Sequence, residues 1–506
     1  MTGIRIDRSP RNAASESFDI AVVGGGIYGA MTLLTAARLG LKAILLERND
    51  FGSATSFNSL RIIHGGLRYL QSADFKRVTG MIRQRAWFLE NFPDLVELLP
   101  CLMPVYNVGL RRKSTLRTAL AIDNYLNRAR NSRLPQQQRI PHGYVTGQDR
   151  TRELFPSVRG KGLKGGAVWC DAHAPDSQRL VMEILRWASA AGGWALNYVA
   201  VDDLLTHDGK VVGVRATDDL SGRELEFRAR AVINAAGPSS RLIAGRFDKD
   251  VADLFRPSLA WNVVLERSSL SDHALAVSRD KRDSHTYFVV PWKEKVMVGT
   301  GHSSFSDGAP IEVGKLQIDE MLEDLNAAIP GAGFVRTEIS SVLAGLLPVR
   351  HEGGVSLAAH EVVIDHGRVG GPDGLISVSG VKMFASQQVA ARVLQLVARR
   401  FLKDNLLRDP QEMRRPSPGV GWELSMRNDC ANAPLDEHRE SIKTIIDEES
   451  VVHLDDLVFR RTTLWENGRY WADNPEPLLS LFAWDAETKA RELSRLTESL
   501  STFSMR

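Results

Sequence analysis

The sequence predicts an α/β fold, in the broad sense of an α+β chain with a Rossmann-like core. Three observations carry this prediction. A strand, a glycine-rich turn, a helix and a second strand follow one another between residues 18 and 47. Short strand-and-glycine elements return near residues 233–238 and 376–382. Strand-like segments predominate over residues 256–350, and charged, mostly helical sequence follows residue 420, so we expect an inserted antiparallel-sheet domain and a short helical C-terminal domain.

The individual elements follow in order along the chain. "FDIAVV" and "KAILLE" have the apolar runs of buried strands, and "MTLLTAARLGL" between them has the pattern of a helix. "ALNYVAVDDLLTHDGKVVGVRATD" alternates as two hairpin strands do, with Asp208-Gly209 as the turn. The remaining expectations are a helical, basic segment over 82–140, a buried strand in "ARAVINAAGP", an amphipathic helix near 314–328 and a long helix after "GLISVSGVKM".

Length and composition limit the classes of protein that the chain can represent. A chain of 506 residues is expected to form two or three domains, and 43% hydrophobic with 25% charged residues is ordinary for a globular protein. The formal net charge is only +3, and no basic tract is interleaved with aromatic residues. Nothing therefore favours a nucleic-acid partner.

Cysteines and apolar runs indicate the compartment. Cys101, Cys170 and Cys430 are scattered and form no CxxC pair, so we expect a reducing compartment, no disulfide scaffold and no metal site. Residues 1–17 lack the apolar centre of a secretory signal, and no window of about eighteen apolar residues occurs anywhere. The expected location is the cytoplasm.

The strongest motif is a dinucleotide-binding fingerprint. Gly24, Gly26 and Gly29 follow a strand and open a helix, and Glu47 ends the next strand. Gly24 allows the tight turn, Gly26 lets the backbone approach a pyrophosphate, and Gly29 lets helix and strand pack closely. Glu47 can accept hydrogen bonds from the adenosine ribose. An NAD enzyme would normally complete its nucleotide domain in one block, whereas here the elements are dispersed, which favours FAD.

Four segments carry a resemblance to a known family: "DIAVVGGGIYGA", "LLERNDFGSATSFNSLRIIHGGLRYLQ", "INAAGP" and "SGVKMFASQ". Together they resemble the FAD-dependent glycerol-3-phosphate dehydrogenases and oxidases of the D-amino-acid-oxidase-like superfamily. The likeness runs from about residue 18 to 405, and more faintly to "LDDLVFRRTTL". It implies a flexible N-terminal extension (1–17), a discontinuous FAD-binding domain (18–81, 160–245 and 340–405), a substrate domain (82–159 and 246–339) and a helical C-terminal appendage (406–506).

The resemblance also implies site residues. FAD would be bound non-covalently, with its ring over the "HGGLRY" loop. The implied cofactor contacts are those of Thr55, Ser56, Arg61, Gly65, Gly66, Val201, Ala236 and Gly237. Gly65 and Gly66 would let main chain lie against a flat ring that side chains would block.

Four residues are expected to act on the substrate. Lys382 would place a cation near the flavin and the substrate, where it stabilises developing negative charge. His64, Arg68 and Tyr69 would face the substrate. Each of these three also has a structural alternative: a hydrogen-bonded core histidine, an arginine that only neutralises phosphate or carboxylate, and a tyrosine that only packs.

The sequence departs from the family on the substrate side. Leu347 in "GLLPV" stands where the family has a phosphate-binding arginine, and His360 stands at a second arginine. Asn262 replaces a family histidine, and His302 a family aspartate. The cofactor half thus resembles the family, while the substrate half does not.

The expected function is hydride transfer from a secondary alcohol of glycerol 3-phosphate, or of a related polyol or hydroxy compound, to flavin N5. Two alternatives remain open: an FAD-dependent amine or amino-acid oxidase, and a non-catalytic flavin-binding protein. Quinone or oxygen would accept the electrons. The basic segment 111–133 allows either peripheral contact with an anionic membrane surface or a solvated helix.

Overall fold

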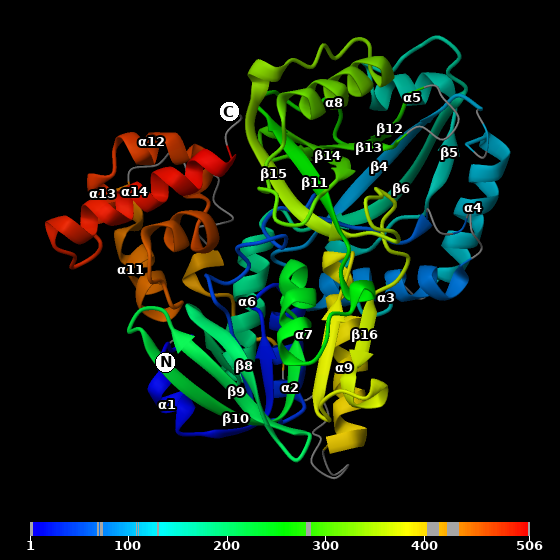
Figure 1. Cartoon of the computed structure of the whole chain (residues 1–506). Coiled ribbons are helices and arrows are strands. Elements are labelled where there is room, and N and C mark those ends of the chain that lie inside the picture. The colour runs from blue at the N-terminus through cyan, green and yellow to red at the C-terminus, as the bar shows by residue number, and fades with distance from the viewer. Residues whose placement is uncertain are drawn as a thin grey trace.

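The computed structural model describes residues 4–67, 70, 74–107, 109, 111–128, 131–279, 285–401, 414–422 and 435–503. Figure 1 shows two sheets, one above the other in that view, with the C-terminal helices beside them. The lower sheet carries α2 and α9, and the upper sheet carries α8. The chain crosses between the sheets several times, so each sheet combines segments that are far apart in the sequence.

The first sheet has the predicted Rossmann-like core. β1 pairs in parallel with β10 and β2, β10 with β17, and β2 with β7. β8 and β9 form an antiparallel hairpin that extends β10, and β16 closes the other edge. The strands, in sheet order, are β16 (Val362–Asp365), β17 (Leu375–Ser379), β10 (Arg223–Asn234), β1 (Ser17–Val23), β2 (Ala43–Leu46) and β7 (Trp194–Leu196), with β8 (Val199–His207) and β9 (Lys210–Asp218).

Helices cover one face of this sheet, and the hairpin and a short helix cover the other. α2 (Ile27–Arg38), α6 (Ser177–Ala190) and α9 (Ser386–Phe401) bury their apolar side chains in one core with strands β1 and β2. The opposite core contains residues of β8, β9 and α7 (Ser240–Phe247). The predicted hairpin turn is confirmed: Asp208 and Gly209 both have positive φ, at 50° and 72°. That geometry matches the twist of hairpin strands.

The second sheet is antiparallel except where β12 runs parallel to β4. Its interior packs against α8 (Lys315–Ala328). Its strands, in order, are β15 (Ile339–Pro348), β11 (Pro257–Leu265), β14 (Lys295–Ser304), β13 (Tyr287–Trp292), β12 (Ala274–Val277), β4 (Glu97–Val105), β6 (Gly165–His173) and β3 (Ile62–Ile63), with β5 (Tyr144–Thr146) paired to β6.

One expected helical segment contains a strand. Within residues 82–140, the helices α3 (Phe75–Asn91) and α4 (Lys113–Leu126) enclose β4. Pro100 and Pro104 lie in β4, and proline is incompatible with a helix interior. The buried side chains of Cys101 and Val105 join two different cores of the second sheet.

The proposed domain boundaries differ from the sheet boundaries. β3, β6 and β15 fall within segments assigned to the FAD-binding domain, yet all three hydrogen-bond in the second sheet. The segment expected to be a flexible extension contains α1 (Pro10–Ala14), and the Arg8 guanidinium donates to the Asn197 carbonyl oxygen at 2.9 Å. The boundaries remain a proposal.

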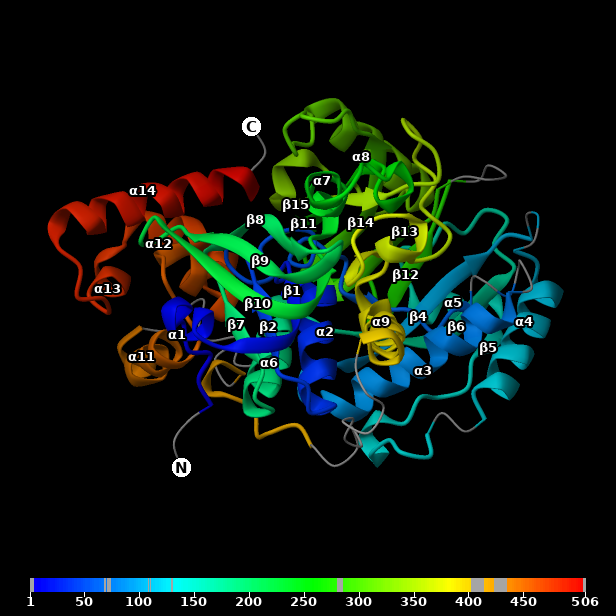
Figure 2. The same ribbon diagram turned by 60° about the horizontal axis from the view of Figure 1, so that its bottom comes forward.

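The C-terminal segment is helical, as expected, over its described part. It packs against the second sheet, because its core includes Val264 of β11 and Trp292 of β13, together with Phe57 from the turn region before β3. Figure 2 shows α14 lying along the outside of this group. The elements of the C-terminal segment are α11 (Arg439–Glu448), the π-helical turn η11 (Asp456–Arg461), α12 (Gly468–Asp473), α13 (Glu476–Leu479) and α14 (Ala486–Phe503). The remaining helices are α5 (Gln148–Leu154) and short 3₁₀ turns such as η7 (Met383–Ala385).

Candidate functional site

The glycine turn after β1 has the close packing that the fingerprint predicts. Gly24 has φ of +105°, and a Cβ atom there would lie 2.7 Å from the carbonyl oxygen of Ala235. A Cβ atom at Gly29 would lie 1.8 Å from the carbonyl oxygen of Gly24. The turn therefore touches both the end of β10 and its own helix α2, and side chains at these two positions would separate them.

Other positions around the turn leave space beside the backbone. A Cβ atom at Gly26 would have only the Ser56 hydroxyl oxygen nearby, at 3.2 Å, and one at Gly237 would meet nothing within 4 Å. Gly26 precedes the first turn of α2, where helical N–H groups and the helix dipole favour an anion. The residues therefore fit a dinucleotide pyrophosphate beside Gly26. The Ser56 hydroxyl, which accepts from the Ile27 N–H at 3.0 Å, lies at the same place.

Glu47 follows β2 and lies directly beside the turn. Its carboxylate accepts from the Gly25 N–H at 2.5 Å and from the Asn49 N–H at 2.8 Å. Burial raises the pKa of Glu47 above its ordinary value, and these two backbone hydrogen bonds oppose that rise. A ribose hydroxyl could donate a further hydrogen bond to the same carboxylate. The chemistry of Glu47 therefore suits the predicted contact with the adenosine ribose, and that contact stays a prediction.

The two other predicted nucleotide contacts lie on neighbouring strands. Val201 is buried in β8, and Ala236 follows β10 directly against Gly24. The Ala236 N–H donates to the side-chain oxygen of Asn234 at 3.4 Å. The structure thus gathers Val201, Ala236 and the glycine turn around one end of the first sheet.

The "HGG" loop is held by one buried carboxylate that the sequence analysis missed. Asp171 on β6 lies 3.0 Å from the His64 Nδ1 and accepts from the Gly65 N–H at 2.7 Å. The Trp169 indole N–H donates to it at 3.2 Å, and the Arg85 guanidinium donates at 3.4 Å. Burial would raise the pKa of Asp171, but the His64 hydrogen bond and the charges of His64 and Arg85 lower it below its ordinary value.

The two glycines of this loop pack against α3. A Cβ atom at Gly65 would lie 2.2 Å from the Arg85 guanidinium, and Gly66 has φ of +96°. Glycine is therefore required here by packing and backbone conformation, a reason that differs from the expected contact with a flat ring. That contact remains a prediction. Arg68 and Tyr69 lie outside the described residues.

Lys382 is brought to the same loop from the far end of the chain. Its ammonium donates to the Met81 sulfur at 3.0 Å, and that sulfur lies 3.5 Å from the Cβ position of Gly66. The Lys382 carbonyl oxygen accepts from the Tyr28 hydroxyl at 2.8 Å, which ties it to α2. Lys382, the "HGG" loop and the nucleotide helix therefore converge on one place.

Thr55 lies beside the second sheet, and Arg61 lies in the core beside two tryptophan rings. The Thr55 hydroxyl donates to the Leu346 carbonyl oxygen at 3.2 Å. The Arg61 guanidinium is fully buried, 4.9 Å from the centre of the Trp292 ring and 5.6 Å from that of Trp465. Burial lowers the pKa of Arg61. These contacts are those of a packed core arginine, and a role for Arg61 in cofactor binding stays a prediction.

Three of the four replaced substrate residues lie on the second sheet, and the fourth, His360, lies just before β16. Asn262 donates to the Asn58 carbonyl oxygen at 2.9 Å, so it faces the segment that leads to the "HGG" loop. His302 on β14 lies opposite Ala260 on β11, and its Nδ1 has no hydrogen-bond partner among the described residues. Burial and the nearby His285 lower the pKa of His302 to about 4. Leu347 is half-buried on β15 and His360 is exposed.

A second histidine–carboxylate pair lies beside β17 of the first sheet. His366 Nδ1 lies 2.8 Å from the Asp248 carboxylate, and its Nε2 lies 2.9 Å from the Ser377 hydroxyl oxygen. The Asn234 amide also donates to that oxygen at 3.1 Å. The trio has the order of a hydrolase triad, but His366 and Ser377 are completely buried, so no substrate can approach. It fastens the ends of β10 and β17.

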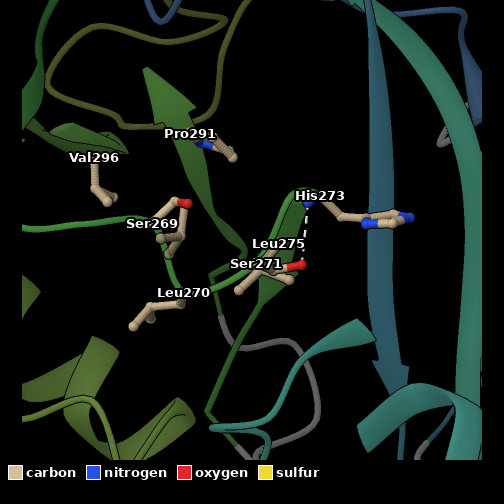
Figure 3. Close-up of a pocket in the computed structure, with 8 residues that line it drawn as sticks. Ser269, Leu270, Ser271, His273, Leu275, Pro291 and Val296 are labelled. Carbon is tan, nitrogen blue, oxygen red and sulfur yellow. Dashed lines mark hydrogen bonds between the residues drawn. The ribbon is translucent and has the colours of Figure 1, made fainter. Parts of the chain in front are cut away.

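The remaining features do not add a second site. Figure 3 shows a shallow hollow beside β12, β13 and β14, in which the Ser271 hydroxyl oxygen accepts from the His273 N–H at 3.1 Å. No predicted site residue lines it, and its room for a water-sized sphere is about 0 Å³, whereas ligand pockets usually measure roughly 300–1,000 Å³. Within the described ranges, no cluster of three or more His, Cys, Asp or Glu side chains could hold a metal ion.

The basic segment forms α4, and its apolar side points inward. Leu116 and Leu120 are buried against the second sheet, and the Arg111 guanidinium donates to the Thr286 hydroxyl at 2.7 Å. Among the residues that the structure describes, no helix is both long and apolar enough to cross a membrane. Peripheral contact through 111–133 stays a prediction.

Sequence comparison identifies a family and several relatives. The sequence model described as "FAD dependent oxidoreductase" matches residues 19–383. A glycerol-3-phosphate dehydrogenase of Synechocystis sp. is 28% identical over 396 residues, covering 75% of this chain and 70% of the relative. An alpha-glycerophosphate oxidase of Streptococcus pyogenes is 32% identical over 335 residues. That match covers 65% of this chain and 54% of the oxidase, so the chain matches about half the length of this relative.

Structural comparison supports the same fold. The X-ray structure of the glycerol-3-phosphate dehydrogenase from Bacillus halodurans, complexed with FAD, superposes with a TM-score of 0.71 at 22% identity. The match covers 98% of this chain and 96% of that one. A Mycoplasma pneumoniae L-alpha-glycerophosphate oxidase with FAD bound gives 0.52 at 15% identity, covering 76% of this chain and 95% of that one. At these identities the similarity establishes the fold, including the helical C-terminal part.

Proposed function

We propose that this chain, which belongs to the family of FAD dependent oxidoreductases, oxidises a small secondary alcohol by hydride transfer to its cofactor. The substrate class is glycerol 3-phosphate or a related polyol or hydroxy compound. The observation that carries the proposal is the convergence of Lys382 and the His64–Gly66 loop on Met81, beside the N-terminal end of α2. Similarity to glycerol-3-phosphate dehydrogenases and oxidases supports the alcohol as substrate.

FAD, when bound, supplies the two-electron acceptor that amino-acid side chains cannot provide. The protein's contribution is binding, orientation and charge. The Gly24–Gly29 turn and Glu47 would hold the nucleotide portion, and the "HGG" loop with Lys382 would lie at the reacting portion.

Among the described residues, His64 is the one best placed to take the alcohol proton. Its Nδ1 lies 3.0 Å from the buried Asp171 carboxylate, which accepts the Nδ1–H and so leaves Nε2 as the acceptor nitrogen. The imidazole is still 39% exposed, so a substrate can reach it. Asp171 also fixes the Gly65 N–H, and one carboxylate thereby orients both the imidazole and the loop.

Lys382 would act through its charge. An ammonium group close to the reacting atoms stabilises the negative charge that develops as the alcohol loses its proton. The Tyr28 hydroxyl donates a hydrogen bond to the Lys382 carbonyl oxygen, which holds the main chain of Lys382 in place. The electrons would then pass to a quinone or to oxygen, which the relatives named dehydrogenase and oxidase make equally reasonable.

An anaerobic substrate screen tests the proposal. The yellow holoenzyme is mixed with glycerol 3-phosphate, other polyol phosphates, unphosphorylated polyols, hydroxy acids and amino acids, and the absorbance near 450 nm is followed. We expect bleaching by at least one alcohol, and bleaching slower by roughly a hundred-fold or more in Lys382→Met.

Two outcomes contradict the proposal. Bleaching by amino acids alone would identify an amine or amino-acid oxidase. Stable FAD with no bleaching by any compound, and no difference in Lys382→Met, would identify a flavin-binding protein without this chemistry. Oxygen consumption compared with reduction of a soluble quinone then distinguishes the two acceptors.

A further inference from the structure

A buried carboxylate joins the nucleotide-binding region to the C-terminal segment. Asp50 is completely buried, three residues after Glu47. Its two oxygens accept from the two terminal nitrogens of Arg461, at 2.6 and 2.7 Å. Arg460 donates to it at 2.5 Å, and the Asn197 amide donates at 3.0 Å. Burial would raise the pKa of Asp50, but the charges of Arg461 and Arg460 hold it far below its ordinary value.

The arginines are themselves fixed inside the C-terminal segment. The Arg461 Nε donates to the Glu449 carbonyl oxygen at 2.9 Å, and Arg460 donates to Asp456 at 2.7 Å. Asp456 in turn accepts from the Tyr198 hydroxyl at 2.6 Å. Bidentate arginine–carboxylate pairs are strong and directional, so this arrangement defines the position of Asp50 closely.

The loop that carries Asp50 also shapes the glycine turn. At its start, the Glu47 carboxylate accepts from the Gly25 N–H at 2.5 Å. At its end, the Gly52 N–H donates to the Gly25 carbonyl oxygen at 3.1 Å. The Asn49 carbonyl oxygen accepts from the Tyr198 N–H at 3.1 Å. Gly25 is therefore held on both sides by a loop whose centre is anchored to residues about 410 positions further along the chain.

We infer that Arg460 and Arg461 are positioning residues for the cofactor: through Asp50 they hold the Glu47–Gly52 loop against the glycine turn, and FAD retention depends on them. The C-terminal segment then contributes to the nucleotide site without touching it. This inference concerns FAD binding alone and does not depend on which substrate the enzyme oxidises.

Substitution of Arg461 by lysine provides the first test. Lysine keeps the positive charge but lacks the planar fork, so it cannot hold both Asp50 oxygens and the Glu449 carbonyl together. The spontaneous release of FAD from diluted holoenzyme is followed by the rise in flavin fluorescence. We expect Arg461→Lys to release FAD roughly ten-fold faster than the unchanged protein.

The chain offers a matched control. Arg179 is equally buried, and it also makes a bidentate pair across the same interface, to Glu449 at 2.7 and 2.8 Å. Within the described residues, its guanidinium pairs with Glu449 and Glu183 and forms no hydrogen bond with the Glu47–Gly52 loop. We expect Arg179→Lys to lower the unfolding temperature to a similar extent, but to release FAD within about two-fold of the original rate. Equal acceleration in both variants, or none in Arg461→Lys, would overturn the inference.

A second measurement needs no variant. Because coupling between two sites is reciprocal, removal of FAD should loosen the arginine pair. We expect the amides of residues 449–461 to exchange with deuterium at least several-fold faster in the apoprotein than in the holoenzyme, while those of α8 stay unchanged. Identical exchange of residues 449–461 in the two forms would reject the inference even if Arg461→Lys did not fold.

Discussion

The two faces of this molecule that enclose the candidate site differ in how completely they are built. On the first sheet, the glycine turn, Glu47, the Asp50 loop and the arginine pair form a continuous set of contacts. On the second sheet, the corresponding surface presents Asn262, His302 and Leu347, and His302 Nδ1 has no hydrogen-bond partner in the part of the chain that the structure describes. The contrast indicates that the cofactor side is specified by close packing, whereas the substrate side can vary without changing the fold.

The largest expected effect is at Gly29, on the cofactor side. In Gly29→Ala the new Cβ would have to displace the Gly24 carbonyl oxygen, which is 1.8 Å away, and overpacking of this kind costs about 3 kcal/mol or more. We therefore expect the Gly29→Ala protein to be purified without FAD. Its FAD content is measured by the ratio of absorbance at 450 nm to that at 280 nm. Gly245→Ala, in α7 with no atom closer than 3.8 Å, serves as the control and should stay yellow. A yellow Gly29→Ala protein would contradict this prediction, because it would show that the turn accommodates a methyl group at position 29 and still binds FAD.

The next effect is at Asp171, where cofactor side and substrate side meet. Asp171→Asn keeps an oxygen for the Gly65 N–H but no longer accepts from His64 with a full charge. General-base catalysis contributes roughly 10²–10⁴-fold, so we expect anaerobic bleaching by the substrate to slow about a hundred-fold with FAD retained.

The control for Asp171 is a second buried histidine–carboxylate pair, that of Asp248 and His366. Asp248 lies 2.8 Å from His366, away from the "HGG" loop. Asp248→Asn should lower stability and leave the bleaching rate of the surviving holoenzyme unchanged. If the two variants slow bleaching alike, His64 has no special part in the reaction.

The sequence predicted the β-α-β unit of the cofactor side, because its signal is local. Gly24, Gly29 and Glu47 lie within one β-α-β unit, and their spacing alone gives the geometry. The resemblance placed Lys382 near the "HGG" loop, and the structure brings them together. The FAD cofactor and the oxidoreductase class are confirmed by the family match.

Long-range contacts account for what the sequence did not predict. Asp171 is a lone acid in the apolar strand "AVWCDAH", and only the pairing of β6 with β3 brings it to His64. A charged residue that interrupts a buried strand was the one available signal. Asp50, Arg460 and Arg461 are equally uninformative in isolation, because their partners lie hundreds of residues away.

A third prediction concerns the incomplete surroundings of His302. Its pKa in the folded protein is about 4, below the ordinary value of 6.5, so the unfolded chain binds more protons between these two pH values. The free energy of unfolding should therefore fall as the pH drops from about 6.5 to about 4, by about 3 kcal/mol at most from this group. Below pH 4 this contribution should level off.

His302→Gln isolates that contribution, because glutamine does not titrate. Urea unfolding of the holoenzyme at pH 7 and pH 4.5 should show a smaller acid-induced loss in the variant. His207→Gln, at an exposed position, should match the unchanged protein. The same acid-induced loss in all three proteins would show that His302 gains protons as freely when folded as when unfolded.

The smallest expected effect restores a charge on the substrate side. Leu347 is half-buried on β15, next to Ser258, whose hydroxyl donates to its carbonyl oxygen at 3.1 Å. Leu347→Arg would place a guanidinium where phosphate can be bound bidentately, and hydrogen bonds to charged groups are worth roughly 1.5–3 kcal/mol. Part of that gain is lost to ordering the side chain, so we expect KM for glycerol 3-phosphate to fall about ten-fold. KM for unphosphorylated alcohols should stay the same, and Leu347→Gln should reproduce neither change. If the arginine leaves both KM values unchanged, the substrate does not reach β15, and the difference between the two sheets would have to be located at Asn262 and His302 instead.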